Sequence, residues 1–202
     1  MQTPTTITDD PPETRPSASP STVHVLANVV AFQAAWAAAI VGAANATPWL
    51  GVGAGTAVLA GHLFTVSNRR HELYLALLTA LIGVTADSLF AASGLLEYSS
   101  GQPASWLAPV WIGGLWLAFA TTLNVAFRWL QHRRVLATVL GAVCGPLSYL
   151  GASTIGAVSF TNTTLALIGL SVTWALLLPT LLALASTFGT DATVEAGEVA
   201  HV

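Results

Sequence analysis

Asp87 is the residue of this sequence best placed to carry chemistry, because it is an acid within a long apolar run, residues 73–96. An ionised carboxylate in hydrocarbon costs at least ~2.5 kcal/mol, so Asp87 must face other protein groups or a cavity. We expect a neutral, protonated acid that both donates and accepts hydrogen bonds. Two interpretations stay open: a proton relay or ligand anchor, or a structural group that joins neighbouring helices.

Aromatic and hydroxyl side chains are expected at the depth of Asp87. A helix advances 1.5 Å per residue, so counting from the predicted helix ends gives each side chain a depth. This count places a candidate binding cluster near mid-membrane: Asp87, Ser148, Tyr149, Trp36, Trp116 and Trp174. The three tryptophans lie too deep for an interfacial belt, and a buried indole N–H needs an acceptor. They predict either an amphipathic pocket around Asp87 or simple aromatic packing.

A second polar layer is expected nearer to the arginine-bearing ends of the helices. It comprises Asn28, His62 and Asn124, each within about two helical turns of a predicted helix end. We expect at least two of the three to meet there through hydrogen bonds, which contribute ~0.6 kcal/mol each within a membrane.

The residue types favour neither metal chemistry nor soluble-type catalysis. Of the five histidines, those inside the apolar runs have no second histidine or acid three or four residues away. The single cysteine, Cys144, excludes a disulfide framework within the chain. We therefore expect no metal, no cofactor and no catalytic triad.

The elements that must position these residues follow from composition. Hydrophobic residues make up 54% of the 202 residues and charged residues 7%, against roughly 25% charged in a soluble domain. Apolar runs of spanning length cover residues 24–44, 49–66, 73–96, 107–130, 135–158 and 164–188. The sequence predicts an all-α integral membrane protein with six transmembrane helices in an antiparallel bundle over residues 23–188. Residues 1–22 and the acidic residues 189–202 are expected to be disordered tails.

Orientation follows from the arginines, which supply all six basic residues of lysine or arginine type. They fall in the N-terminal tail and around the second and fourth connections, and the other three connections have none. The positive-inside rule then places both termini in the cytoplasm and the protein in the cytoplasmic (inner) membrane. A net charge of −3 argues against nucleic acid as a partner. Membrane lipids are the expected partners, with another membrane protein as a further candidate.

Small residues recur at four-residue spacing on three predicted helices, which is typical of close helix packing in membranes. One ridge is Gly53, Ala57 and Gly61, a second is Ala35, Ala39 and Ala43, and a third is Gly141 and Gly145. We expect helix backbones to approach closely along all three. Pro146 and Pro179 lie inside predicted helices and free backbone carbonyls there.

Several motifs in order resemble an uncharacterised bacterial inner-membrane family, domain-of-unknown-function family number twenty-eight seventy-eight. They include Asn28–Gln33 (NVVAFQ), Asp87-Ser88, Phe119–Asn124 (FATTLN) and Gly145–Tyr149 (GPLSY). The resemblance covers about residues 24 to 187. Family members often carry an arginine where this chain has Ser153-Thr154, so a partner contact made by that arginine would be missing here. The resemblance implies a contextual link to membrane fatty-acid modification and supplies no site residues.

Three functions are compatible with these features. The one we favour is a non-enzymatic accessory that binds or presents a lipid or other hydrophobic molecule. A small transporter or substrate-binding membrane subunit is the alternative, and it predicts an outward-open pocket and a partner docked on the alanines of the first helix. A lipid-acting enzyme using Asp87 is the second alternative, and it predicts another polar side chain within hydrogen-bond reach of Asp87.

Overall fold

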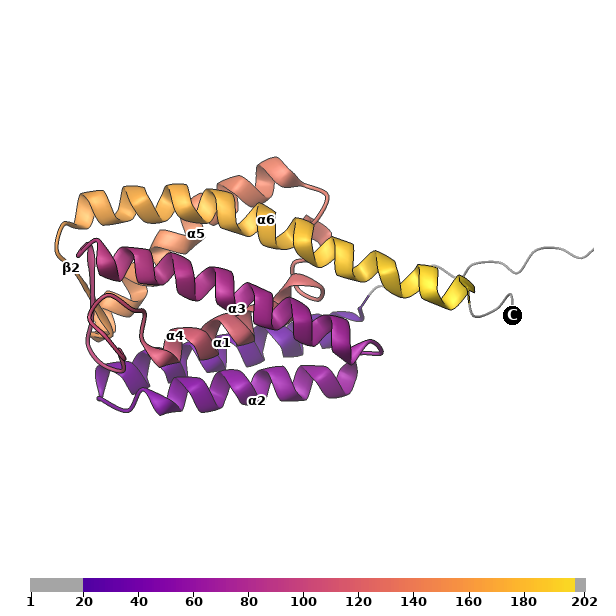
Figure 1. Cartoon of the computed structure of the whole chain (residues 1–202), viewed down its shortest axis with the longest axis horizontal. Helices are drawn as coiled ribbons and strands as arrows, with labels where there is room; N and C mark the ends of the chain where they lie inside the picture. Colours follow the sequence, from indigo (N-terminus) through magenta and orange to yellow (C-terminus); the bar gives the residue numbers. More distant parts are fainter. Residues whose placement is uncertain (1–19, 199–202) are drawn as a thin grey trace, which may run out of the picture.

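The computed structural model describes the backbone of residues 20–198 and the side chains of residues 20–188. Six α-helices and one short 3₁₀ helix account for most of this part of the chain, and two short strands join them (Figure 1). The helices are α1 (Thr22–Ala44), α2 (Trp49–Thr65), α3 (Arg69–Ala92), α4 (Val110–Leu123), η1 (Arg128–Leu130), α5 (Arg134–Ile155) and α6 (Thr163–Glu198). The strands are β1 (Leu96–Tyr98) and β2 (Val158–Phe160).

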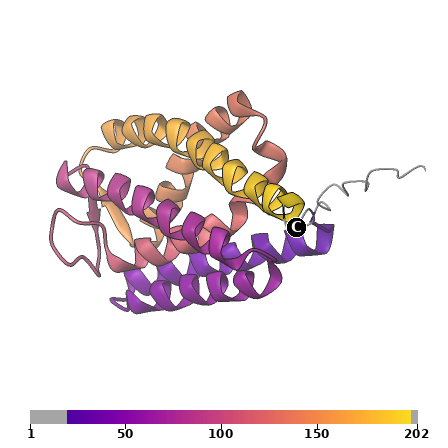
Figure 2. The same ribbon diagram turned by 45° about the vertical axis from the view of Figure 1, so that its right-hand side comes forward.

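Consecutive helices run in opposite directions, and α4 lies at the centre of the first four (Figure 1). It packs on α1, α2 and α3, while α5 and α6 form a hairpin that packs mainly on itself. The hairpin joins the four-helix group through α3 and α6 on one side, whereas α1 and α5 touch sparingly on the other. Figure 2 shows α5 and α6 set apart from α1 and α2 across the width of the bundle.

Four of the helices are long and apolar enough to cross a membrane: α1, α3, α5 and residues 163–188 of α6. The other two are shorter than the predicted runs. With 17 and 14 residues, α2 and α4 are about 25 and 21 Å long, less than the ~30 Å hydrocarbon core. The expectation of six helices that each have spanning length is therefore corrected to four of spanning length and two shorter ones.

The predicted fourth run, 107–130, is broken at both ends by local chemistry. Pro109 is the extended residue before α4, with ψ 155°, and the helix starts after it. At the other end the hydroxyls of Thr121 and Thr122 donate to the carbonyls of Ala118 and Phe119, and α4 ends at Leu123. Ten of its fourteen residues are buried, so α4 is enclosed by protein and does not need to match the membrane thickness itself.

The connections after α3 and α5 form a two-stranded antiparallel sheet that begins where the predicted third and fifth runs end. β1 pairs with β2 so that Tyr98 lies opposite Val158. The predicted third and fifth runs extended to residues 96 and 158, but α3 ends at Ala92 and α5 at Ile155. Gly156, with φ +90°, stops α5 in a left-handed conformation that side chains disfavour. Alternating burial of Leu96 and Tyr98 then keeps the ribbon against the core.

Glycines allow α2 and α4 to pack with their backbones in contact, but not along the ridge that we predicted. A Cβ on Gly55 would lie 2.0 Å from the Gly114 carbonyl oxygen, and one on Gly114 would lie 2.5 Å from the Gly51 carbonyl oxygen. Gly53 and Gly61 have open space instead, so the ridge predicted through Gly53, Ala57 and Gly61 is wrong and the true contact is offset by two residues.

The other two small-residue ridges pack inside the bundle. Ala35, Ala39 and Ala43 of α1 are all buried within the chain. Because they are buried, these alanines are not available to dock a partner protein, as the transporter-subunit alternative required. The glycines of the third ridge, on α5, receive a side chain of α6, as described below.

The predicted tails only partly overlap the described residues. Residues 1–19, most of the tail predicted over residues 1–22, and residues 199–202 lie outside them. α1 begins at Thr22, where the Ser21 hydroxyl accepts a hydrogen bond from the backbone of His24. α6 continues to Glu198, ten residues past the predicted end of the sixth span.

Candidate functional site

Asp87 accepts hydrogen bonds from three side chains and is 2% exposed. The indole N–H of Trp116 donates to Oδ2 over 2.7 Å, and the Tyr98 hydroxyl donates to Oδ1 over 3.0 Å. The Tyr149 hydroxyl also bonds Oδ1. These donors come from α4, β1 and α5, so the carboxyl group of α3 joins four elements.

The three partners restrict where a proton on Asp87 can sit. An indole N–H only donates, so Oδ2 must be an acceptor in every state. A proton on the acid therefore lies on Oδ1, with one tyrosine hydroxyl turned to accept it. When Asp87 is ionised, both tyrosines donate to Oδ1 instead. Both tyrosines line the cavity, so the one that accepts the proton can turn its own hydroxyl hydrogen toward the cavity.

Asp87 lies nearer to one end of its helix than we expected. The sequence count put it about nine residues from the outer end of the third span. Because α3 ends at Ala92, Asp87 is five residues from that end, or about 8 Å along the axis. Tyr98 reaches it from the β ribbon just beyond the helix. Burial raises the pKa of the Tyr98 hydroxyl well above its usual range, and the neighbouring Asp87 and Tyr149 raise it further, so the hydroxyl remains protonated.

Two tryptophan rings stack face to face next to Asp87. The rings of Trp116 and Trp174 lie 5.1 Å apart with an interplanar angle of 15°. Each ring lies directly on a glycine of a neighbouring helix. A Cβ on Gly83 would lie 2.0 Å from the Trp116 ring, and one on Gly145 would lie 2.2 Å from the Trp174 ring. The stack therefore requires glycine at both positions.

A cavity of about 450 Å³ lies between α1, α4, α5 and α6, with Asp87 in its wall. This volume is within the range of small-molecule sites in proteins. The lining extends along α5 from Leu140 to Ala152, about 18 Å of helix, so the cavity is elongated. Apolar and aromatic side chains form most of its surface, with Tyr149, Ser148 and Gln33 among the polar groups.

The cavity reaches the surface of the bundle between α1 and α5. Gln33 on α1 and both Cys144 and Leu147 on α5 line it and are exposed. These two helices touch sparingly, as noted above. The opening therefore lies on the side of the bundle and not at either end of it. The outward side chains of both helices are mostly apolar there.

The structure joins four of the six candidate residues in direct contact and places the other two, Trp36 and Ser148, elsewhere in the cavity wall. Asp87, Tyr149, Trp116 and Trp174 form a continuous set of contacts. Trp36 forms the opposite wall of the cavity, beside Gly151. Ser148 lines the cavity, but its hydroxyl donates to the Gly145 carbonyl and not to Asp87.

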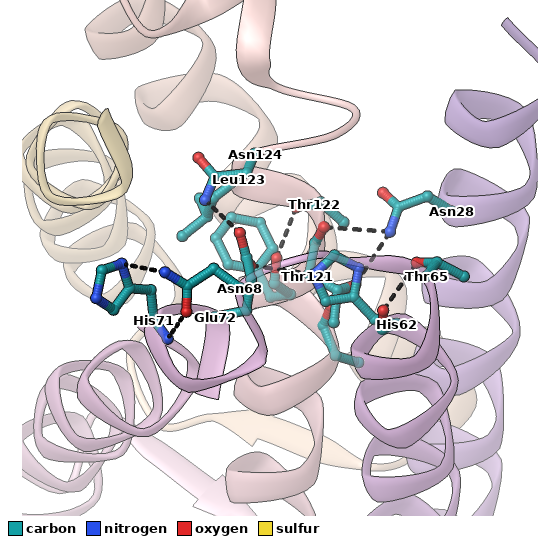
Figure 3. Close-up of polar contacts among 12 residues, drawn as sticks. Asn28, His62, Thr65, Asn68, His71, Glu72, Thr121, Thr122, Leu123 and Asn124 are labelled. Carbon is teal, nitrogen blue, oxygen red and sulfur yellow. Dashed lines mark hydrogen bonds and ion pairs between the residues drawn. The ribbon is translucent and has the colours of Figure 1, made fainter. Parts of the chain in front are cut away.

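The second polar layer is organised by Glu72, a residue outside the predicted set (Figure 3). Its Oε1 accepts from the Asn124 amide over 2.8 Å, and its Oε2 lies 3.0 Å from Nε2 of His62. The Asn124 oxygen accepts in turn from Gln131 over 2.8 Å. His62 and Asn124 thus meet through one shared carboxylate, which links α2, α3 and the end of α4.

Asn28 does not join this network. Its amide nitrogen donates to the backbone oxygen and the hydroxyl of Thr121, over 3.2 and 3.1 Å. Figure 3 shows it beside the other polar groups, on the neighbouring helix α1. It links α1 to α4, as the Glu72 network links α2 and α3 to α4.

Sequence reasoning missed Tyr98 and Glu72. Tyr98 lies between the predicted runs 73–96 and 107–130, and a strand of three residues is too short for the alternation of apolar and polar residues to predict it. Glu72 precedes the predicted run 73–96, so counting depth within the runs did not include it. Its side chain faces His62, whereas the adjacent His71 contacts Asn68. No group of three or more His, Cys, Asp or Glu within the part of the chain that the structure describes is arranged to hold a metal.

Comparison with known proteins identifies a family. A family model described as Protein of unknown function (DUF2878) matches residues 25–180. The match includes Asp87, all its partners and the whole cavity lining, and it confirms the resemblance noted in the sequence. No curated protein and no solved structure matches the chain.

Proposed function

The chain belongs to this family of proteins of unknown function, DUF2878, and we propose that it binds a single-chain, lipid-derived molecule inside its helical bundle. The observation that carries the proposal is the elongated cavity with an apolar, aromatic wall and a hydrogen-bonding group at Asp87. Such a cavity suits an amphipathic ligand, because a hydrocarbon chain fills the apolar part and a polar head finds partners at one place.

The topology that goes with this proposal is a six-pass protein of the cytoplasmic membrane. Arg69, Arg70, Arg128, Arg133 and Arg134 all lie at the same end of the bundle, around the connections from α2 to α3 and from α4 to α5. The positive-inside rule assigns that end, with both termini, to the cytoplasm. Asp87 then lies toward the outer side.

The dimensions of the cavity support a ligand with a chain. A volume of about 450 Å³ holds on the order of fifteen non-hydrogen atoms, since one water occupies roughly 30 Å³. The lining runs from Val158 of β2, near Asp87, to Phe127 near the arginine end. If the polar head of the ligand lies near Tyr149, the part of the cavity toward the arginine end, between Phe119 and Leu140, is left for its hydrocarbon chain.

The sideways opening supports entry from the membrane. A lipid-derived molecule is dissolved in the bilayer, and the gap between α1 and α5 faces that phase. Gln33 lies at the opening, and its amide group can both donate hydrogen bonds to and accept them from the polar head of a ligand that passes through. The same features fit a protein that presents the molecule to another membrane component.

A second candidate is a lipid-acting enzyme, and one observation favours it. Asp87 has two tyrosine hydroxyls within hydrogen-bond reach, which is the arrangement that an acid or base at this position needs. In this case Tyr149, which lines the cavity, passes a proton between Asp87 and the ligand, and Asp87 stores that proton. Membrane lipid extracts of a deletion strain carrying wild-type or Asp87→Asn protein test this. A lipid present only with wild type supports an enzyme, and identical extracts contradict it.

Binding of radiolabelled palmitic acid to the purified protein in detergent tests the main proposal. A Cβ on Gly151 would lie 3.5 Å from the Trp36 ring, an ordinary contact distance, so Gly151→Leu places its side chain in the cavity. Gly53 faces open space on α2, and Gly53→Leu is the matched control. We expect saturable binding that Gly151→Leu weakens at least tenfold and Gly53→Leu changes less than twofold. Absence of saturable binding, or equal loss in both variants, contradicts the proposal.

A further inference from the structure

A second concave surface lies at the arginine end of the bundle, between the start of α5 and α6. This groove has a volume of about 830 Å³ and is separate from the internal cavity, with which it shares no lining residue. We propose that the groove binds the headgroup of an anionic phospholipid, with the acyl chains lying against α5 and α6.

The rim of the groove is basic. Arg133 and Arg134 are adjacent and exposed, and the exposed His132 adds a further hydrogen-bonding group. The lining contains no acidic residue. Neither arginine forms an ion pair with a carboxylate of residues 20–188. Two guanidinium groups without a carboxylate partner in this range suit a phosphodiester, whose oxygens accept charge-assisted hydrogen bonds.

The floor of the groove is apolar, which selects a lipid over a free phosphate. Val135 and Val139 are one helical turn apart on α5 and are 80% and 52% exposed, and Ala183 of α6 faces them across the groove. This surface begins at the arginines and continues along the helix into the membrane-spanning part. A ligand that is anionic at one end and hydrocarbon below complements both parts at once.

An aromatic side chain marks the groove as lying at the membrane surface. Trp129 is 53% exposed, and the guanidinium carbon of Arg133 lies 5.4 Å above its ring. Exposed tryptophans and arginines of transmembrane proteins lie at the level of lipid headgroups. Basic pockets between helices on the cytoplasmic side are suited to anionic headgroups.

The chain contains a matched control for this site at the same end of the bundle. Arg69 and Arg70 are also adjacent and exposed, and Arg69 lies 5.7 Å above the ring of Phe64. Neither residue lines the groove. Replacing either arginine pair by glutamine removes the same charge from the same end of the molecule, but only one replacement removes the groove's rim.

The test compares phosphatidylglycerol with phosphatidylcholine of the same acyl chains, bound to the full-length protein in detergent and measured by native mass spectrometry. We expect wild type to prefer phosphatidylglycerol by about 30-fold, or about 1 kcal/mol for each arginine. Arg133→Gln/Arg134→Gln abolishes this preference, whereas Arg69→Gln/Arg70→Gln leaves it within threefold. Lysine at positions 133 and 134 retains most of it, which shows that the glutamine variant failed through lost charge and not through misfolding.

Three results overturn the proposal. One is a wild type without preference between the two lipids. Another is equal loss in both glutamine variants, which indicates diffuse attraction to the whole arginine end. The third is complete displacement of phosphatidylglycerol by millimolar inorganic phosphate, which indicates a phosphate site and not a lipid site. The proposal does not rest on ligand binding in the internal cavity, so each can fail alone.

Discussion

Replacement of Asp87 by leucine and by asparagine should have different consequences for stability. Leucine is apolar and strands three buried donors, the hydroxyls of Tyr98 and Tyr149 and the indole of Trp116. A hydrogen bond within a membrane contributes ~0.6 kcal/mol on average, and an unsatisfied buried donor costs ~1–3 kcal/mol. Three lost bonds therefore predict a loss of ~2–4 kcal/mol for Asp87→Leu, with partial relief because the tyrosines can turn toward the cavity.

Asparagine can hydrogen-bond all three partners in one side-chain orientation, with the hydroxyl hydrogens of both tyrosines turned toward the cavity that they line. The amide oxygen must face Trp116, which only donates, and the amide nitrogen must face Tyr98 and Tyr149, whose hydroxyls can accept. The expected cost of Asp87→Asn is below ~1 kcal/mol. Asparagine thus preserves the structure while removing the ionisable group.

Unfolding of the purified variants in mixed micelles, titrated with sodium dodecyl sulfate and followed by circular dichroism, measures these free energies. The prediction is a clear shift of the midpoint for leucine and a small one for asparagine. A leucine variant as stable as wild type would show that the three hydrogen bonds contribute nothing. An asparagine variant as unstable as leucine would show that the carboxylate charge, and not hydrogen bonding, holds the site together.

Three further predictions test other parts of the structure. Glu72→Ala should cost ~1–3 kcal/mol by stranding His62 and Asn124, whereas Glu72→Gln should cost less than half of that, both by the same unfolding titration; equal losses would contradict the network. Gly83→Ala should destabilise by ~1–3 kcal/mol because its methyl group overlaps the Trp116 ring, while Gly53→Ala in open space should be neutral or slightly stabilising; equal effects would contradict this packing. Reporter tags at residues 2 and 201 should both be cytoplasmic in accessibility assays, and periplasmic exposure of either one would refute the topology.

The sequence predicted the helical elements well where they face lipid. α1, α5 and the membrane-length part of α6 follow long apolar runs, because a helix in contact with lipid must be apolar along its whole spanning length. It failed for α4, because apolar residues continue on both sides of the helix and extend the run to 107–130 in spite of Asn124 and Arg128. Hydropathy measures burial, and α4 is buried in protein, so composition could not reveal where its helix begins and ends.

The site was predictable in its residue types but not in its connections. An isolated acid in an apolar run must find partners, which drew attention to Asp87, and Tyr149 and Trp116 were expected near its depth. The rotation of each helix about its axis decides which of the residues at one depth meet. The spacing of residues in the sequence does not determine that rotation. This is why Ser148 was grouped with Asp87 although it bonds its own helix. Tyr98 depended on a pairing of β1 with β2, which are far apart in the sequence.

Photo-cross-linking tests the binding proposal most directly. The protein is reconstituted into lipid vesicles with a photoactivatable fatty acid, and the positions of the covalent cross-links are determined. Peptide mass spectrometry then identifies the labelled residues. Binding in the cavity predicts labelling concentrated on Trp36, Cys144 and Leu147, which line it, and its competition by unlabelled palmitic acid. Labelling spread without competition over outward residues of α6 such as Ile168 and Val172 would show contact with bulk lipid alone and contradict the account.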